Sequence, residues 1–101
     1  MEFGLNEIDV AKLNKVFSEF PVIDEVVIYG SRAKGNFRNG SDIDITLKGD
    51  IDLETLNKIS AKLDDLLLPY LIDLSIFRQI SNSDLVDHIH RIGKVFYKRR
   101  S

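Results

Sequence analysis

The apolar residues near the start of the chain recur at intervals of three and four. They stand at Ile8, Val10, Leu13, Val16, Phe17 and Phe20. This spacing predicts an amphipathic helix over residues 8–20 with one face in the core. Asn6 is suited to the N-cap, and the Phe20–Pro21 pair ends the helical pattern because proline disfavours helical backbone in the residue before it.

Two strands with a loop between them follow. Residues 25–29 are β-branched, apolar and aromatic, which is typical of a buried strand. Residues 30–41 contain three of the chain's six glycines and the basic residues Arg32, Lys34 and Arg38, and they predict a loop. Residues 42–47 alternate strictly between polar and apolar side chains, so they predict a strand with one buried face.

The second half of the chain also contains both helical and strand patterns. A leucine-rich stripe from Leu53 to Leu67 predicts a helix that Pro69 stops. Residues 70–77 predict a strand whose apolar run is interrupted by Asp73, and a last helix and a short strand over residues 95–97 follow. The order of elements indicates an α+β fold, and the 101 residues are expected to form one domain, residues 1–101.

Composition narrows the functional classes. The chain has 14 Lys and Arg against 16 Asp and Glu, a net charge of −2, so direct nucleic-acid binding is not expected. It has no cysteine, which excludes disulfides and thiolate metal sites and favours a cytoplasmic protein. No apolar run approaches the roughly 20 residues that a membrane-spanning helix needs.

The residues most indicative of chemistry are Gly30-Ser31 and, ten residues later, Asp42-Ile43-Asp44. Glycine permits close approach of the backbone to a ligand, and Ser31 and the amides after it can donate hydrogen bonds to phosphate oxygens. Asp42 and Asp44 are two residues apart on a strand, so their carboxylates point to the same face. Carboxylate pairs suit Mg²⁺ that carries a nucleotide's phosphates. The alternative is a strand that merely turns polar residues to solvent.

Asp73 is the third candidate. A lone carboxylate in an apolar strand is costly to bury unless it is paired or binds a metal. If this strand neighbours the strand of Asp42 and Asp44, three carboxylates converge and raise one another's pKa values. The alternative is an outward-facing residue on the sheet.

Other patterns fit structural roles better. Gly30 and Gly35 have the glycine spacing of a P-loop, but the Lys-Ser/Thr pair is missing. Asp52 precedes a predicted helix and is interpreted as its N-cap. His88 and His90 are two residues apart on a helix, so they cannot chelate one ion together, and each is interpreted as a surface or packing residue.

Together, Gly30-Ser31, Asp42-Ile43-Asp44 and Ile72-Asp73-Leu74 resemble the minimal nucleotidyltransferase family of the DNA polymerase β-like superfamily. The resemblance implies a mixed sheet with helices packed on one face, and Mg²⁺-dependent transfer of a nucleoside monophosphate from ATP to a hydroxyl. It implies that Asp42, Asp44 and Asp73 are catalytic and bind the metal, with Asp73 helping to deprotonate the attacking hydroxyl. Gly30 and Ser31 would bind the nucleotide, and Arg32 would make a phosphate or a structural contact.

The resemblance also suggests a partner. Small members of this family resemble antitoxins that pair with an all-helical HEPN-family toxin and attach AMP to a toxin tyrosine. An oligomer with itself or with the partner is compatible with this. Two alternatives stay open: an antitoxin that neutralises its partner by binding alone, and an enzyme that modifies a small molecule such as an antibiotic. Lys34 and Arg38 add positive charge to the site or lie in a solvated loop.

Overall fold

The computed structural model describes residues 2–100 and contains four α-helices, a short 3₁₀ helix and four strands over that range. Their order is α1 (Glu7–Ser18), β1 (Ile23–Tyr29), α2 (Gly30–Lys34), β2 (Ile43–Gly49), α3 (Leu53–Asp64), β3 (Ile72–Ile76), η1 (Phe77–Gln79), α4 (Ser83–Ile92) and β4 (Lys94–Lys98). The α+β class is therefore confirmed.

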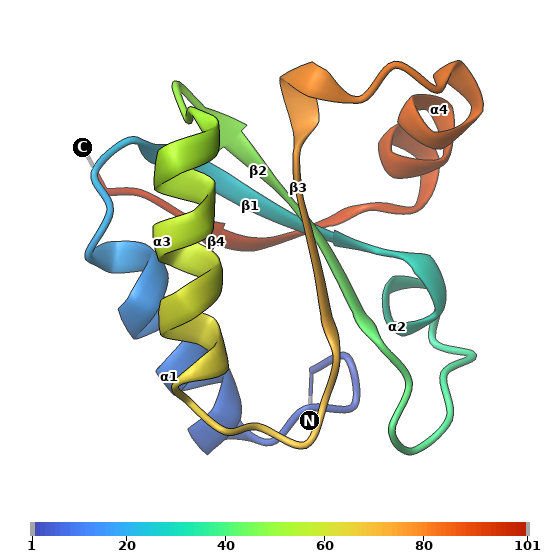
Figure 1. Cartoon of the computed structure of the whole chain (residues 1–101). Helices are drawn as coiled ribbons and strands as arrows, with labels where there is room; N and C mark the ends of the chain where they lie inside the picture. Colours follow the sequence, from blue (N-terminus) through green and yellow to red (C-terminus); the bar gives the residue numbers. More distant parts are fainter. Residues whose placement is uncertain (1, 101) are drawn as a thin grey trace.

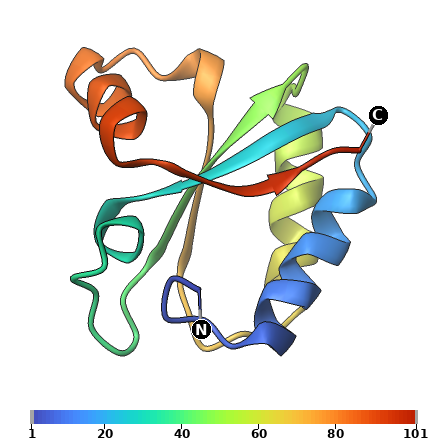
Figure 2. The same ribbon diagram turned by 180° about the vertical axis from the view of Figure 1, so that it is seen from behind.

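The four strands form one sheet in the order β3-β2-β1-β4. β1 lies antiparallel to both β2 and β4, whereas β2 and β3 run parallel. A parallel pair needs a crossover connection, and α3 supplies it. The sheet is thus mixed, as the family resemblance implies, and its central strands are visible from opposite sides in Figures 1 and 2.

One face of the sheet carries the main core. Val26 and Ile28 of β1, together with the apolar side of β2, pack with buried residues of α1 and α3. Figure 1 shows these two helices together on one side of the sheet, with α2 and α4 on the other. The core residues from the two helices include Leu13, Phe17 and Ile59, all essentially without solvent exposure.

The opposite face is covered differently. Residues next to each other along a strand point to opposite faces, so Val27 and Tyr29 face away from the main core. They form a second, smaller cluster with Ile89 of α4. The expectation of helices on one face therefore holds for α1 and α3 but not for α4, because the apolar residues on the second face of β1 also need cover.

Some element boundaries predicted from the sequence differ from those of the structure. Residues 30–34 form the helix α2 and are not part of a loop. α3 ends at Asp64, three residues earlier than the stripe of leucines indicated. Ile8 and Leu53, counted in the apolar stripes, are 67% and 64% exposed. Ile8 shares the i, i+4, i+7 face of α1 with the exposed Lys12 and Lys15, and not the face of the buried Leu13. Within residues 2–100, no helix combines the length and apolar character that crossing a membrane requires.

Candidate active site

The strand register places Asp44 and Asp73 side by side. Asp44 pairs with Asp73 on β3 and with Tyr29 on β1, so these residues form a row across three strands. Register partners on adjacent strands point to the same face. Ile43 and Ile45 on either side of Asp44 are buried in the main core, so the row lies on the opposite face.

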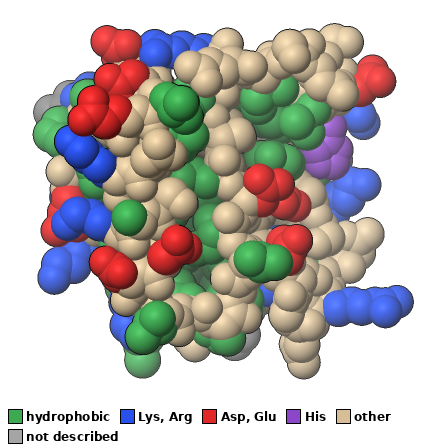
Figure 3. All heavy atoms as spheres, viewed as in Figure 1, with side chains coloured by type: hydrophobic (Ala, Val, Ile, Leu, Met, Phe, Trp, Pro, Cys, Tyr) green, Lys and Arg blue, Asp and Glu red, His purple; other side chains and the backbone are tan. Residues whose placement is uncertain are grey.

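The sequence predicts a strand that includes Asp42, but Asp42 lies one residue before β2. The backbone N–H of Ile43 donates to the carbonyl oxygen of Leu71 at 2.8 Å, which holds this end of the strand against the segment leading into β3. Asp42 and Asp73 are exposed and Asp44 is half-buried. In Figure 3, acidic side chains lie right of the centre, beside hydrophobic ones and below a histidine.

The acidic residues influence one another's ionisation. Burial raises the pKa of the Asp44 carboxyl, and the negative charges of Asp73 and Asp42 raise it further, whereas His88 acts in the opposite direction. Burial also raises the pKa of the Tyr29 hydroxyl; the charges of Asp73 and Asp44 add to this and a hydrogen bond with Ser75 opposes it. The ionised form of Asp44 is therefore disfavoured by its burial and by the neighbouring negative charges.

These carboxylates fit Mg²⁺ as partial ligands. Hard oxygen donors are the ligands it prefers, and the repulsion that raises the pKa of Asp44 would be relieved by a cation. Among the residues from 2 to 100, no group of three or more acidic or histidine side chains is arranged to hold a metal ion by itself. Mg²⁺ is commonly bound by one or two carboxylates plus phosphate oxygens of the substrate, so this arrangement suits an ion that arrives with a nucleotide.

The Gly30–Ser31 turn directly faces Asp44. Gly30 has a φ of +74°, a conformation that other residues rarely adopt. A Cβ atom on Gly30 would collide with the Asp44 carboxylate. Glycine is therefore required here for two reasons, and it brings the backbone of the turn into contact with the acidic row.

Arg32 makes a structural contact. Its side chain is 2% exposed. Its guanidinium group donates to the carbonyl oxygen of Ser41 from Nε at 3.1 Å and from Nη2 at 2.8 Å, and to that of Phe3 from Nη1 at 2.8 Å. It also stacks on the rings of Phe37 and Tyr70. Of the two roles considered for Arg32, the structure supports the structural one: it holds the carbonyl group immediately before Asp42.

The neighbouring basic residues and the Asp50-Ile51-Asp52 segment, which has the same Asp-x-Asp pattern as Asp42-Ile43-Asp44, lie outside this arrangement. Lys34 and Arg38 are both exposed. The Asp52 side chain accepts a hydrogen bond from the Thr55 backbone N–H at 2.8 Å, and this bond lowers the pKa of the Asp52 carboxyl. Asp52 is thus confirmed as the N-cap of α3.

The sequence analysis missed one residue of the site. His88 packs edge-on against Tyr29, with ring centroids 6.1 Å apart, and its Nε2 accepts a hydrogen bond from the Gly30 backbone N–H at 3.3 Å. A signal was available, because Leu85, His88, Ile89 and Ile92 share the i, i+3, i+4, i+7 spacing of one helix face. His90, in contrast, is exposed, with its ring 5.7 Å from that of Phe77.

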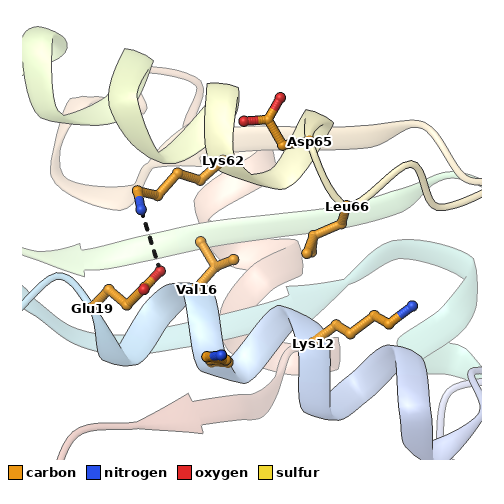
Figure 4. Close-up of a pocket in the computed structure, with 7 residues that line it drawn as sticks. Lys12, Val16, Glu19, Lys62, Asp65 and Leu66 are labelled. Carbon is orange, nitrogen blue, oxygen red and sulfur yellow. Dashed lines mark ion pairs between the residues drawn. The ribbon is translucent and has the colours of Figure 1, made fainter.

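The helices α1 and α3 form a hollow away from the acidic residues. A groove of about 490 Å³ runs between α1 and α3 and is lined by Lys12, Lys15, Val16, Glu19, Lys62, Asp65 and Leu66. Figure 4 shows that an ion pair between Lys62 and Glu19, at 3.6 Å, spans it. Asp42, Asp44 and Asp73 do not line this groove, which is on the side of the sheet that α1 and α3 cover.

Comparison with known proteins decides the family. The family model for the polymerase beta nucleotidyltransferase domain matches residues 11–101. The chain belongs to this family. As a nucleotidyltransferase, it has the enzyme class that the Gly-Ser and Asp-x-Asp residues predicted.

Solved structures share the fold of this nucleotidyltransferase. A toxin–antitoxin with AMP-PNP superposes with a TM-score of 0.70 and 24% identity, over 95% of this chain and 76% of that one. A tri-AMPylated Shewanella oneidensis HEPN toxin in complex with an MNT antitoxin gives 0.67 and 19%, over 94% and 74%. A nucleotidyltransferase described as putative from Sulfolobus solfataricus gives 0.54 and 20%, over 95% and 92%. No curated protein matches the sequence of the nucleotidyltransferase.

Proposed function

We propose that this nucleotidyltransferase transfers AMP from ATP to a hydroxyl group, a tyrosine of a HEPN-family toxin, and thereby acts as its antitoxin in the cytoplasm. The observation that carries the proposal is the contact between the Gly30 turn and the Asp44–Asp73 pair. It joins a turn suited to phosphates to carboxylates suited to a metal ion. Nucleotide transfer requires both at one place.

The nucleotide end of the site is formed by the turn. Gly30 allows the ATP phosphates to approach the backbone, and Ser31, half-buried at the start of α2, donates hydrogen bonds to them. Asp42, Asp44 and Asp73 are the residues that would hold Mg²⁺. Bound there with ATP, Mg²⁺ would offset the negative charge that builds up on the phosphate oxygens during transfer.

The acceptor end of the site is the exposed side of β3. The hydroxyl oxygen of the acceptor forms a bond to the α-phosphorus of ATP, and the bond from that phosphorus to the pyrophosphate oxygen breaks. The hydroxyl proton passes to the carboxylate of Asp73, which is exposed and therefore accessible to a group on another protein. The products are AMP-tyrosine and pyrophosphate.

The proposed acceptor rests on the fold relatives. One of them is a complex of an MNT antitoxin with a tri-AMPylated HEPN toxin, and another is a toxin–antitoxin with AMP-PNP. Asp73 lies on β3, which is an edge strand of the sheet, so a large partner can approach it without displacing another strand. A helical toxin is an acceptor of this kind.

A dose experiment with the cognate HEPN toxin tests the proposal. A substoichiometric amount of the nucleotidyltransferase, given Mg²⁺ and ATP, should silence the toxin, and the toxin should gain mass in steps of one AMP. The toxin should stay silent after the nucleotidyltransferase is removed. Asp44→Asn should fail at the same dose, whereas Asp52→Asn should protect, because asparagine also caps helices.

The opposite outcome points to neutralisation by binding. In that case Asp44→Asn would protect as well as the wild type, and only when it is present at the same concentration as the toxin. The toxin would show no gain in mass and would recover its activity once separated. Either result would overturn the proposed transfer to the toxin.

A further inference from the structure

The helix α2, which carries the nucleotide-binding turn, lacks a cap of its own. It has five residues, too few to be stable alone, and its first N–H groups have no acceptors within the helix. The residue before it, Tyr29, makes no capping hydrogen bond with its side chain. An acceptor from another part of the chain can therefore hold the turn in one conformation.

The other three α-helices of residues 2–100 are capped locally. Asn6, Asp52 and Asn82 each accept a hydrogen bond from the backbone N–H three residues later, at 2.8, 2.8 and 3.1 Å. At α2 the corresponding acceptor is Nε2 of His88, which is 58 residues away and receives the N–H of Gly30. This long-range hydrogen bond replaces the local cap at the helix that begins with Gly30.

His88 packs against Tyr29, which lies beside Asp44. Its ring lies edge-on to that of Tyr29, the β1 member of the row, and it is close enough to Asp44 to affect the pKa of that carboxyl. α4 thus contacts both halves of the site, the turn through His88 and the sheet through Ile89. A shift of α4 would change the position of Gly30 relative to Asp44.

We propose that His88 is a positioning residue for nucleotide binding: by accepting the Gly30 N–H it fixes the turn in the conformation that receives the ATP phosphates. This rests on the proposed function, because it assigns a role within that same site. Gly30 then uses its N–H to anchor the turn, and Ser31 with the amides after it remains to bind phosphate. His88 does not itself contact the reacting atoms.

Three variants test this role. His88→Phe keeps an aromatic ring against Tyr29 but has no acceptor, and His88→Gln restores an acceptor oxygen without the ring. His90→Phe, on the exposed side of the same helix, is the matched control. The measurements are the Kd of Mg²⁺-ATP by calorimetry on the chain alone, and the KM and kcat of AMP transfer to the cognate toxin.

His88→Phe should raise the Kd and KM for Mg²⁺-ATP roughly tenfold, the size expected for losing one capping hydrogen bond, with a smaller change in kcat. His88→Gln should recover most of the affinity, and His90→Phe should match the wild type. A melting curve for each variant confirms that it is folded. The Gly30 amide hydrogen should exchange faster in His88→Phe than in His88→Gln.

Other outcomes would overturn the proposal. If His88→Phe binds Mg²⁺-ATP as the wild type does, the contact only packs α4. If it binds more tightly, His88 obstructs the phosphate site and does not position the turn. In both cases the proposed function still stands if the wild type transfers AMP to the toxin. If the wild type itself binds no Mg²⁺-ATP, the proposed function fails and this role fails with it.

Discussion

The two faces of the sheet are built on different principles. The face under α1 and α3 is held by many apolar contacts, each of which can be exchanged for another of similar volume at modest cost. The face that carries Asp44 and Asp73 has a smaller apolar cluster around Val27 and Ile89, and it depends in addition on polar contacts with fixed partners, such as Gly30 with His88. Substitutions on the first face should therefore affect stability, and those on the second should affect the reaction.

The largest expected effect is on the apolar face. Phe17 is fully buried and its ring packs against Phe96 and Tyr97. Phe17→Ala should lower the free energy of unfolding by about 3–5 kcal/mol, because it removes apolar burial and leaves a cavity. Urea denaturation measures this. Ile8→Ala on the exposed side of the same helix should change it by less than about 0.5 kcal/mol, and equal losses would contradict the assignment of the core.

The next largest effect is expected at Gly30, on the face that carries Asp44. Gly30→Ala places a methyl group against the Asp44 carboxylate and should reduce AMP transfer roughly 100-fold, the cost of displacing a reacting group by about 1 Å. Gly40→Ala is the matched control, since Gly40 also has a positive φ of +81° but nothing lies within 4 Å of its added Cβ. Both variants share the backbone strain, so a similar loss of transfer in Gly40→Ala would show that strain, and not the collision, is responsible.

Arg32 combines both kinds of contact, because its side chain is buried and it also makes polar contacts with fixed partners. Arg32→Met should lower stability by about 2–3 kcal/mol, since the carbonyl groups of Ser41 and Phe3 lose their donors. Arg32→Lys should not restore it, because an ammonium group cannot reproduce the paired donors to Ser41 or the stacking on Phe37. Thermal melting checks both, with Arg38→Ala, an exposed neighbour, expected to match the wild type.

The smallest effect is a dependence on pH. The raised pKa of Asp44 means that its ionised form costs stability in the folded protein. Asp44→Asn, without Mg²⁺ or nucleotide, should therefore melt at a higher temperature than the wild type at pH 7. The difference should fade as the pH falls through the raised pKa toward the ordinary carboxyl value of about 4.

Asp52 should show the opposite effect to Asp44, because its pKa is lowered and not raised. Hydrogen bonds from Thr55 lower the pKa of its carboxyl, so its ionised form stabilises the folded protein above a pH of about 4. Asp52→Asn should melt slightly below the wild type at pH 7, and this difference should also disappear as the pH falls through the lowered pKa. If both variants shifted in the same direction at pH 7, the burial of Asp44 and the negative charges around it would not be the cause.

The sequence predicts the apolar face better than the polar one, for a physical reason. Periodicity reports which residues face a core, so the alternation of Ile43, Ile45 and Leu47 was enough to place β2 and, by exclusion, to put Asp44 on the other face. It does not report which strand is the neighbour, so the pairing of Asp44 with Asp73 needed the register. A single polar contact leaves no periodic signal.

Arg32 and His88 illustrate that limit. Arg32 stands in a basic, glycine-rich segment whose composition indicates solvent exposure, yet its neighbours in space, Phe3 and Tyr70, come from distant parts of the chain. From the sequence, His88 is interpreted as a surface or packing residue, because it and His90 are two residues apart on a helix and cannot chelate one ion together. Its partner is a backbone N–H, which no side-chain pattern reveals.

The distance along the chain between Gly30 and His88 also bears on the order of folding. A local cap can form as soon as its own helix does, but the cap of α2 becomes available only when α4 has docked, 58 residues later. Contacts of such long range close late, because the intervening chain must first lose its freedom. During synthesis, therefore, β1 and β2 can pair before the Gly30 turn is held in place, and the ability to bind nucleotide should be among the last properties that a newly made chain acquires.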